Sequence, residues 1–336
     1  MKKWISLFII AFSLIASSCV NQFPIEEETG KVYLTVMRDA EWLPDAVINL
    51  SREGAANVEL RYDFRVYPKG NTKDCLKQFT IYKTDLTGES FQTSFEMHPG
   101  DYDIYCWSDF AYATDGQPVY YDDSNFSAIT YIKPYEGDSD YRDAFRGVTT
   151  FTVNRSGYYQ MQPVEATILL TRPLARYIFI ATDLEDFIEK EASRVRNRNS
   201  DPLSDFGDPS RVTNLDDYVV KVTYPLYMPA VFDNFLNNPI DSWTGVSFEG
   251  KMTKLSDQEA RLAFDYVMVN GEESGVQVML EVYDIEGVLI ARTNSITIPT
   301  KRNRTTLVYG KYLTTLRNDG VGIDPDFDGS FNIELP

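Results

Sequence analysis

Histidine is almost absent from this chain of 336 residues: the only one is His98. It lies in the turn signal His98–Pro99–Gly100, where a solvated side chain is the usual arrangement. A Ser-His-Asp triad needs a histidine as its general base. The sequence also lacks a Gly-x-Ser-x-Gly elbow, a phosphate-binding glycine loop and a His-Glu-x-x-His motif. We therefore expect a protein that is not an enzyme and that uses no cofactor.

Basic residues are scarce as well. The chain has 32 lysines and arginines against 50 aspartates and glutamates, which gives a formal net charge of −18. A surface this acidic repels phosphate backbones and anionic headgroups. We therefore expect no nucleic-acid partner and no charge-driven contact with a membrane.

The apolar run Trp4–Ile15 is too short for a transmembrane helix, which needs about 20 residues. It follows Lys2 and Lys3 and precedes Ala16–Ser17–Ser18–Cys19. A basic start, a short apolar segment and small residues make a secretory signal. Small residues before a cysteine resemble the lipobox of bacterial lipoproteins. We expect residues 1–18 to be a lipoprotein signal peptide and Cys19 to carry lipid. The alternative is an ordinary secreted protein with an incidental cysteine.

Only two further cysteines are present, Cys75 and Cys106. An even pair in an exported protein is able to form one disulfide. Against this, Cys106 shares a strand face with Tyr102 and Ile104, which indicates a buried free thiol. Both alternatives stay open at this point. We expect no zinc site, because two cysteines with one distant histidine do not supply its ligands.

Aromatic residues are plentiful, and most of the chain is a succession of short alternating segments separated by turn signals. Strands are expected at Val32–Val36, Val58–Tyr67, Phe79–Thr84, Ser90–Met97, Asp101–Trp107, Gly147–Val153, Val164–Leu170, Tyr177–Ala181, Val219–Tyr224, Arg261–Val269, Gly275–Tyr283, Val288–Thr293 and Thr305–Tyr309. One helix is expected at Asp183–Asn197, with Asp183 as its N-cap. Parallel α/β folds need a helix after most strands. The pattern therefore predicts an all-β fold.

The organisation along the chain predicts two tandem antiparallel β-sandwiches, with the one short helix in the second. We expect a tether at residues 19–30, a first sandwich at 31–170 and a second at 171–336. Residues 108–146 are polar, rich in tyrosine and weakly periodic, which indicates a long connection. Residues 225–245 are expected to be irregular.

One segment near the C-terminus has the spacing of a calcium loop. Asp324, Asp326 and Asp328 alternate before Gly329, but the acid expected at loop position 12 falls on Leu335. We expect a polar turn that leads into a terminal strand. The alternative is a calcium site.

Five motifs together resemble the Bacteroidetes-type fimbrillin-like lipoproteins, in particular the group with fimbrial anchor and minor subunits. The motifs are Gly100–Asp109, Asp143–Gly147, Leu170–Arg176, Ile298–Gly310 and Ile323–Gly329. The resemblance implies two transthyretin-like (Ig-like) sandwiches and an outer-membrane lipid anchor at the cell surface. It also implies a role as a structural or adhesion subunit of a fimbria (pilus), with other fimbrial subunits as partners.

In this family, subunits join by strand complementation, in which an extended segment of one subunit completes a sheet of the next. Stalk subunits lose their first strand to a protease that cuts after a basic residue. Lys31 and Arg38 flank the first strand here and are expected to be ordinary strand-flanking charges. The alternative function is a surface lipoprotein that binds a glycan or another host ligand. It would need exposed aromatics such as Trp107, Trp243 or Tyr120–Tyr121.

Overall fold

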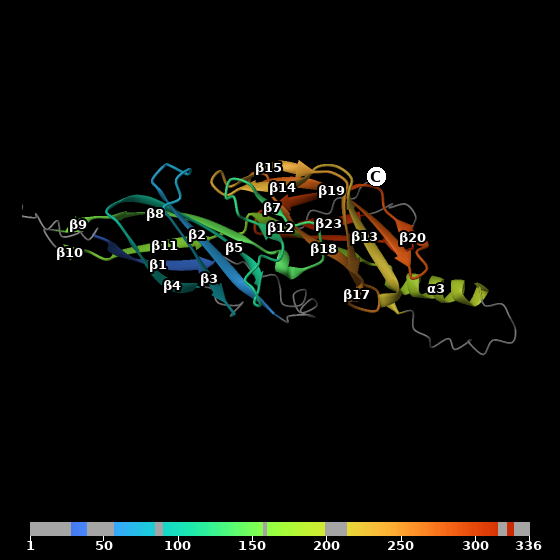
Figure 1. Ribbon diagram of the computed structural model, residues 1–336. Helices are drawn as coiled ribbons and strands as arrows, with labels where there is room; N and C mark the ends of the chain where they lie inside the picture. Colours follow the sequence, from blue (N-terminus) through green and yellow to red (C-terminus); the bar gives the residue numbers. More distant parts are fainter. Residues whose placement is uncertain are drawn as a thin grey trace, which may run out of the picture.

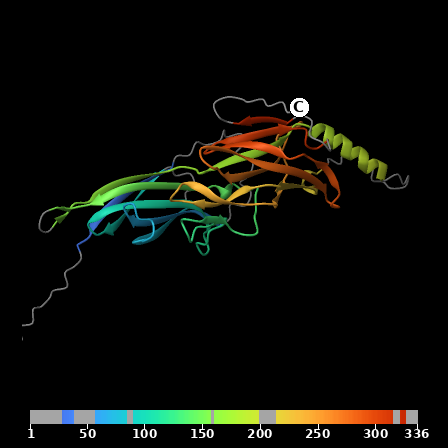
Figure 2. The same cartoon turned by 90° about the horizontal axis from the view of Figure 1, so that it is seen from above.

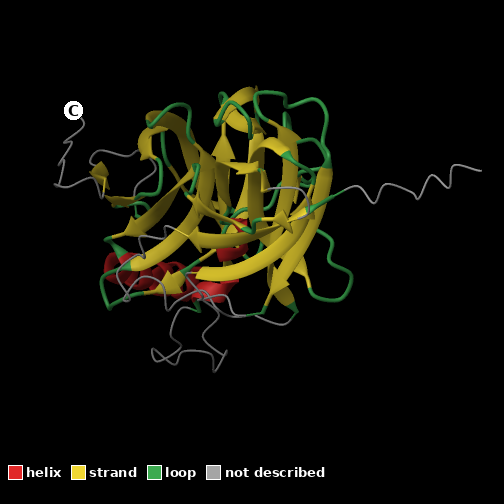
Figure 3. Ribbon diagram, turned by 90° about the vertical axis from the view of Figure 1, so that its left-hand side faces the viewer, coloured by secondary structure: helices red, strands yellow, loops and turns green. Residues whose placement is uncertain are grey.

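The computed structural model describes residues 28–38, 57–84, 90–156, 160–198, 214–314 and 321–325. Two β-sandwiches lie end to end (Figures 1 and 2). Figure 3 looks along the long axis and shows the strands curving round the cores, with the helix outside them. The expected all-β fold with one helix is confirmed for the described residues. Among these residues, no helix is long and apolar enough to cross a membrane.

The first sandwich packs a three-stranded sheet, in the order β11-β1-β4, against a four-stranded sheet, in the order β3-β2-β5-β8. Its strands are β1 (Gly30–Arg38), β2 (Val58–Pro68), β3 (Lys77–Lys83), β4 (Ser90–Met97), β5 (Gly100–Tyr112), β8 (Phe145–Val153) and β11 (Val164–Leu170). A small hairpin of β9 (Arg155–Ser156) and β10 (Gln160–Met161) extends from its outer end (Figure 1). The core contains the alternating side chains Val32, Leu34 and Val36 of β1.

Gly147 of β8 lies where the two sheets of the first sandwich come together. A Cβ atom at this position would lie 2.6 Å from the carbonyl oxygen of Leu169 on β11. Beside it, Arg146 and Thr171 exchange two backbone hydrogen bonds of 2.9 and 2.8 Å. The missing side chain therefore lets the sheets close at this corner, next to the second sandwich.

The second sandwich packs the sheet β17-β18-β12-β22-β23 against the sheet β16-β13-β19-β20, with β21 also paired to β19. Its elements are β12 (Leu174–Ala181), α3 (Leu184–Arg198), a 3-10 turn (Leu215–Asp217), β13 (Tyr218–Tyr224), β14 (Met228–Asp233), β15 (Asn238–Trp243), β16 (Val246–Lys251), β17 (Thr253–Lys254), β18 (Ala260–Met268), β19 (Glu273–Asp284), β20 (Leu289–Arg292), β21 (Ile296–Lys301), β22 (Thr305–Gly310) and β23 (Val321–Pro325).

Among the described strands, each sandwich contains one parallel pairing besides its antiparallel ones. β1 pairs in parallel with β11, and β12 pairs in parallel with β22. In both cases the first strand of a sandwich lies beside a strand from its end. The sequence pattern did not predict these pairings, because alternation specifies the face of a strand and not its neighbour.

The helix forms where the sequence predicted it. Leu184 and Phe187 are fully buried, so one face of α3 covers the end of the second core. Asp183 precedes the helix as expected. Its carboxylate, however, accepts hydrogen bonds from the backbone N–H groups of Leu313 and Thr314, at 3.1 and 2.8 Å. Asp183 therefore joins the start of α3 to the segment after β22.

The expected connection between β5 and β8 is an integral part of the second sandwich. We call residues 113–144 the crossing segment; it contains β6 (Tyr121–Asp122), β7 (Ile129–Tyr131) and a 3-10 turn (Asp140–Arg142). β7 pairs with β14 in a four-stranded sheet of order β15-β14-β7-β6. The expectation of irregular structure at residues 225–245 was therefore wrong, because β14 and β15 form there.

Candidate functional site

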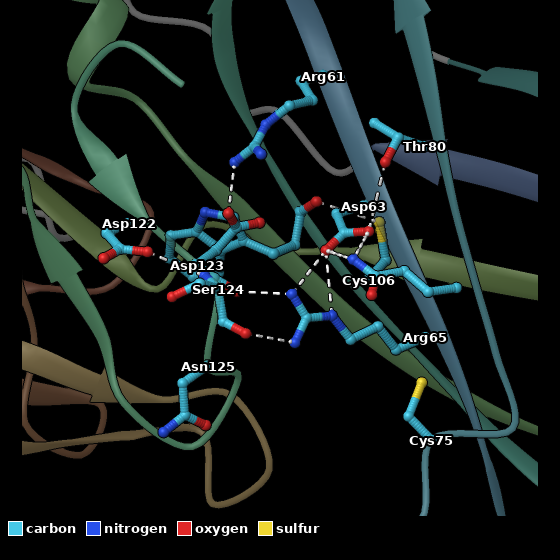
Figure 4. Close-up of polar contacts among 12 residues, drawn as sticks. Arg61, Asp63, Arg65, Cys75, Thr80, Cys106, Asp122, Asp123, Ser124 and Asn125 are labelled. Carbon is cyan, nitrogen blue, oxygen red and sulfur yellow. Dashed lines mark hydrogen bonds and ion pairs between the residues drawn. The ribbon is translucent and has the colours of Figure 1, made fainter. Parts of the chain in front are cut away.

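The outward face of β2 and β5 carries a buried cluster of charges (Figure 4). Side chains alternate along a strand. Tyr62 and Phe64 accordingly enter the first core, and Arg61, Asp63 and Arg65 point to the other side. The crossing segment covers this side, and Asp123 and Ser124 come from it. The cluster is thus part of the junction between the two halves.

Arg61 binds two carboxylates in this cluster. Its Nε lies 2.9 Å from Oδ1 of Asp109 on β5, and its Nη2 lies 2.9 Å from Oδ1 of Asp123 in the crossing segment. A second bond joins Nη2 to Oδ2 of Asp109 at 3.0 Å. The planar guanidinium suits such a bidentate pair. One arginine therefore connects a strand of the first sandwich to the segment that continues into the second.

Arg65 connects the same two parts through backbone atoms. It donates to Oδ2 of Asp63, and to the carbonyl oxygens of Asp123 at 2.7 Å and Ser124 at 3.1 Å. Its guanidinium lies 3.9 Å from the ring centroid of Phe126, a residue of the second core. Gln78 also donates to Asp63, so this buried carboxylate is fully engaged in hydrogen bonds.

Burial changes the acidity of the carboxyl groups in this cluster. It raises the pKa of Asp109 to about 7, against the opposing effect of Arg61. Burial also raises the pKa of Asp63, against the effect of Arg65. The pKa of Asp109 is therefore close to neutral pH.

A second buried cluster lies inside the second core. Arg142, at the end of the crossing segment, places its Nε 2.8 Å from Oδ1 of Asp265 on β18, and the two side chains are 1% and 0% exposed. The hydroxyls of Tyr135 and Tyr224 donate to the other oxygen of Asp265, each at 2.6 Å. The guanidinium lies 4.2 Å from the ring centroid of Tyr135. Among the described residues of this core, Asp265 is the only carboxylate with zero exposure. Its cation, Arg142, comes from the first half of the chain.

Three of the five sequence motifs meet next to this cluster. Arg172 forms a bidentate pair with Asp143, at 2.6 and 2.7 Å, and also donates to the side chain of Asn303. Arg176 lies 3.0 Å from Asp140. These three motifs each contribute one residue, Asp143, Arg172 or Asn303, to the contacts between the halves.

Several predicted site residues lie outside the described residues. These are Cys19, Asp326 and Asp328. Asp324 lies on β23, where its backbone pairs with Leu307, and nothing is described of its side chain. The calcium alternative and the lipidation of Cys19 are therefore not tested. In the described ranges, no group of three or more His, Cys, Asp or Glu side chains could hold a metal ion.

Cys75 and Cys106 are not joined in the structure, and each is a free thiol. Cys106 is buried in the first core, and burial raises its pKa well above the ordinary value for a thiol. Cys75 is exposed in the loop between β2 and β3. The two thiols donate to different backbone carbonyls, those of Lys77 and Trp107.

The aromatics named for a glycan platform do not form one. Trp107 and Tyr121 are fully buried in the second core, and Tyr120 is half-buried against it. Trp243 differs, because it lines an open pocket of about 510 Å³. A platform built from all four residues is therefore excluded. Tyr120 and Trp243 are both half-buried, and of the two only Trp243 lines the pocket.

Sequence reasoning missed the crossing segment as the element that carries both clusters. Its tyrosines recur without a period of two or 3.6 residues, so the pattern resembled a decorated loop. A usable signal was the density of aromatic and charged residues together, since exposed loops seldom carry so many large rings.

Fold and junction together define an all-β protein of two sandwiches held as one body by a crossing segment. The chain belongs to the family described as "Family of unknown function (DUF6562)", whose model matches residues 26–336. No curated protein matches the chain.

Three solved structures to which the chain is similar are fimbrial proteins. The fimbrial anchor protein Mfa2 from Porphyromonas gingivalis has 11% identity and a TM-score of 0.44, over 90% of this chain and 100% of that one. The tip fimbrial protein Mfa3 of the same organism has 11% identity and a TM-score of 0.41, over 88% and 98%. A fimbrial assembly protein from Parabacteroides distasonis has 10% identity and a TM-score of 0.43, over 90% and 98%.

Replacing Arg142 tests how far the junction depends on the buried pair. Arg142→Met should lower the free energy of unfolding by about 3–5 kcal/mol, because Asp265 keeps a buried charge without its cation. Urea unfolding measures the change. The matched control is Arg155→Met, whose exposed pair with Glu28 at 3.6 Å should contribute less than about 1 kcal/mol. Equal effects of the two substitutions would contradict the assignment.

Asp109 predicts a specific pH dependence. Its folded pKa of about 7 lies above the ordinary value of 3.8, so the folded state binds this proton more tightly than the unfolded state. Its contribution to stability is therefore complete below about pH 4 and is lost as the pH rises to 7. Relative to Asp109→Asn, the wild type should lose about 2–4 kcal/mol across that range, measured by urea unfolding at each pH.

Asp122→Asn is the matched control for this pH experiment. Hydrogen bonds from Ser124 lower the pKa of Asp122, so its contribution is present above about pH 4 and is lost only in more acidic solution. Between pH 5 and 7 the control should follow the wild type. An Asp109→Asn curve parallel to the wild type over the same range would refute the assignment.

Proposed function

We propose that the protein is a lipid-anchored structural or adhesion subunit of a fimbria, held at the outer membrane by Cys19 and exposed at the cell surface. It acts as an anchor or accessory subunit through assembly with other fimbrial subunits and catalyses no reaction. The observation that carries this proposal is the position of β1, the first strand after the tether.

β1 is a central strand of the first sandwich. It pairs with β11 on one side and with β4 on the other, and Val32, Leu34 and Val36 are at most 1% exposed. Gly30, where β1 begins, lies 11 residues after Cys19. A force on the lipid would therefore act along a strand with hydrogen bonds on both edges, which suits a load-bearing attachment.

The polarity of β1 also supports an anchor. Val32 pairs with Val164 at the start of β11, next to the β9–β10 hairpin, and Arg38 pairs with Leu170 near the junction. The chain thus enters at the outer pole of the first sandwich, opposite the second sandwich (Figures 1 and 2). A tether at this pole would hold the second sandwich away from the membrane, where partners arrive.

The burial of Arg38 at the end of β1 favours retention of the strand. Arg38 is 8% exposed and its guanidinium lies 5.2 Å from the ring centroid of Phe145. A protease needs an extended, accessible segment, so a buried arginine in a paired strand is a poor substrate. Retention of β1 and of the preceding tether suits an anchor better than a stalk subunit, in which strand complementation would fill the vacated place.

Lipidation is tested at Cys19. The wild type should incorporate labelled palmitate and sediment with membranes, whereas Cys19→Ala should lose nearly all of the label and enter the soluble fraction, because no acyl chain remains to partition into lipid. Cys75→Ala is the control and should keep the label. If Cys19→Ala stays labelled and membrane-bound, the anchor proposal fails.

A reversible lock on β1 separates an anchor from a stalk subunit. Thr35 and Gln92 face each other across β1 and β4, with a side-chain hydrogen bond of 3.4 Å. Thr35→Cys with Gln92→Cys, in a Cys75→Ser background, should form a disulfide that holds β1 in place. Co-purification of fimbrial subunits identified by mass spectrometry should be unchanged by oxidation, because an anchor keeps β1.

The reduced form of the same variant is the control for the lock. Capture that is lost on oxidation and restored on reduction would show that β1 must leave its place. That result would overturn the anchor role and support a stalk-type exchange of strands.

A further inference from the structure

The open pocket at Trp243 lies outside the assembly role and is built from both halves of the chain. Lys133, Pro134 and Tyr135 of the crossing segment line one side. The hairpin between β15 and β16 lines the other, with Ser242, Trp243, Thr244, Val246 and Ser247. Its volume of about 510 Å³ is within the range of small-ligand sites, about 300–1,000 Å³.

An aromatic ring and a cation lie together in this pocket. Trp243 is half-buried and meets Tyr131 edge to face, with centroids 6.0 Å apart. The ammonium of Lys133 lies 4.5 Å from the centroid of the Trp243 ring. Lys133 is exposed and forms no ion pair with any of the residues that the structure describes. The chain has a net charge of −18, so an unpaired lysine beside an indole is an unusual positive site on an acidic protein.

The remaining polar groups of the pocket are neutral hydroxyls. Those of Ser242, Thr244 and Ser247 make no hydrogen bond within the described ranges, so they are available to a ligand. The hydroxyl of Tyr135 is committed to Asp265, so this residue offers only its ring. The adjacent carboxylate, Asp241, is exposed on β15 and accepts the N–H of Ser242 at 2.7 Å.

We propose that this pocket binds a carboxylated sugar ring of an acidic glycan. The apolar C–H face of a pyranose packs on the indole of Trp243, the carboxylate pairs with the ammonium of Lys133, and ring hydroxyls bond to the free serine and threonine hydroxyls. The open mouth admits a sugar that is part of a chain. Uronic acids and sialic acids share this chemistry, and the two probes below distinguish them.

The test titrates the lipidated full chain, in detergent, with tri-galacturonate and with 3′-sialyllactose. The neutral matches are methyl-esterified tri-galacturonate and lactose. At least one acidic sugar should bind at least about tenfold more tightly than its neutral match, since a charge-assisted contact is lost in the latter. Lys133→Met should abolish this preference, and Lys133→Arg should retain it. Isothermal titration calorimetry measures each affinity.

Two further variants make the result specific to the pocket. Trp243→Ala should weaken the acidic sugar by about tenfold or more, because the stacking surface is removed. Lys83→Met is the matched control, since Lys83 lies 4.6 Å from the ring centroid of Phe91 in the first sandwich and does not line the pocket. If Trp243→Ala fails to fold, the variants of the exposed Lys133 test the proposal without it.

Three outcomes would overturn the proposal. The first is no binding of either acidic sugar at about 10 mM, where even a weak complex with a Kd near 1 mM is nearly saturated. The second is equal binding of the acidic sugars and their neutral matches. The third is an equal effect of Lys133→Met and Lys83→Met. None of them bears on the fimbrial role, which the Cys19 and β1 experiments address separately.

Discussion

The contact between Arg142 and Asp265 is the constraint on which the rest of the structure depends. A carboxylate at zero exposure is stable only with a cation and hydrogen-bond donors around it. β18 belongs to the second half of the chain and the cation to the first, so the second core is complete only when the crossing segment occupies it. A buried ion pair adds little net stability, but it specifies one arrangement, because any other leaves a charge unpaired. The halves therefore form one body.

The same constraint explains which parts of the fold the sequence could predict. Strands such as β1 and β19 alternate cleanly, because one of their faces meets a core and the other is more accessible. On β2 the polar positions Arg61, Asp63 and Arg65 also alternate with apolar ones, a pattern typical of a strand with one solvent-exposed face. The structure buries that face under the crossing segment. Local alternation reports polarity, and polar side chains that are buried and paired look the same in sequence as solvated ones.

Three of the five motifs that carry the family resemblance meet at the junction, which gives these three a structural rather than a catalytic role. Arg172 donates hydrogen bonds to both Asp143 and Asn303 where the chain passes between the sandwiches. Residues in such a junction need partners of fixed length and charge, so they form recognisable short patterns. They record how two sandwiches are joined and give no information on what the molecule binds. The scarcity of histidine agrees with this, since these contacts are made by arginine, aspartate and asparagine.

The junction and the pocket are mechanically connected through Tyr135. Its ring lines the pocket beside Lys133, and its hydroxyl donates to Asp265 in the core. Arg142 donates to that same hydroxyl at 2.8 Å. The side of the pocket formed by the crossing segment is thus held by the contact that joins the halves, and the other side belongs to β15 and β16. A ligand that bridges both sides gains contacts only while the halves are docked, so its binding stabilises the docked form. If the protein is anchored as we propose, a load that entered through β1 would pass through this junction, and the pocket would lie between β1 and the second sandwich.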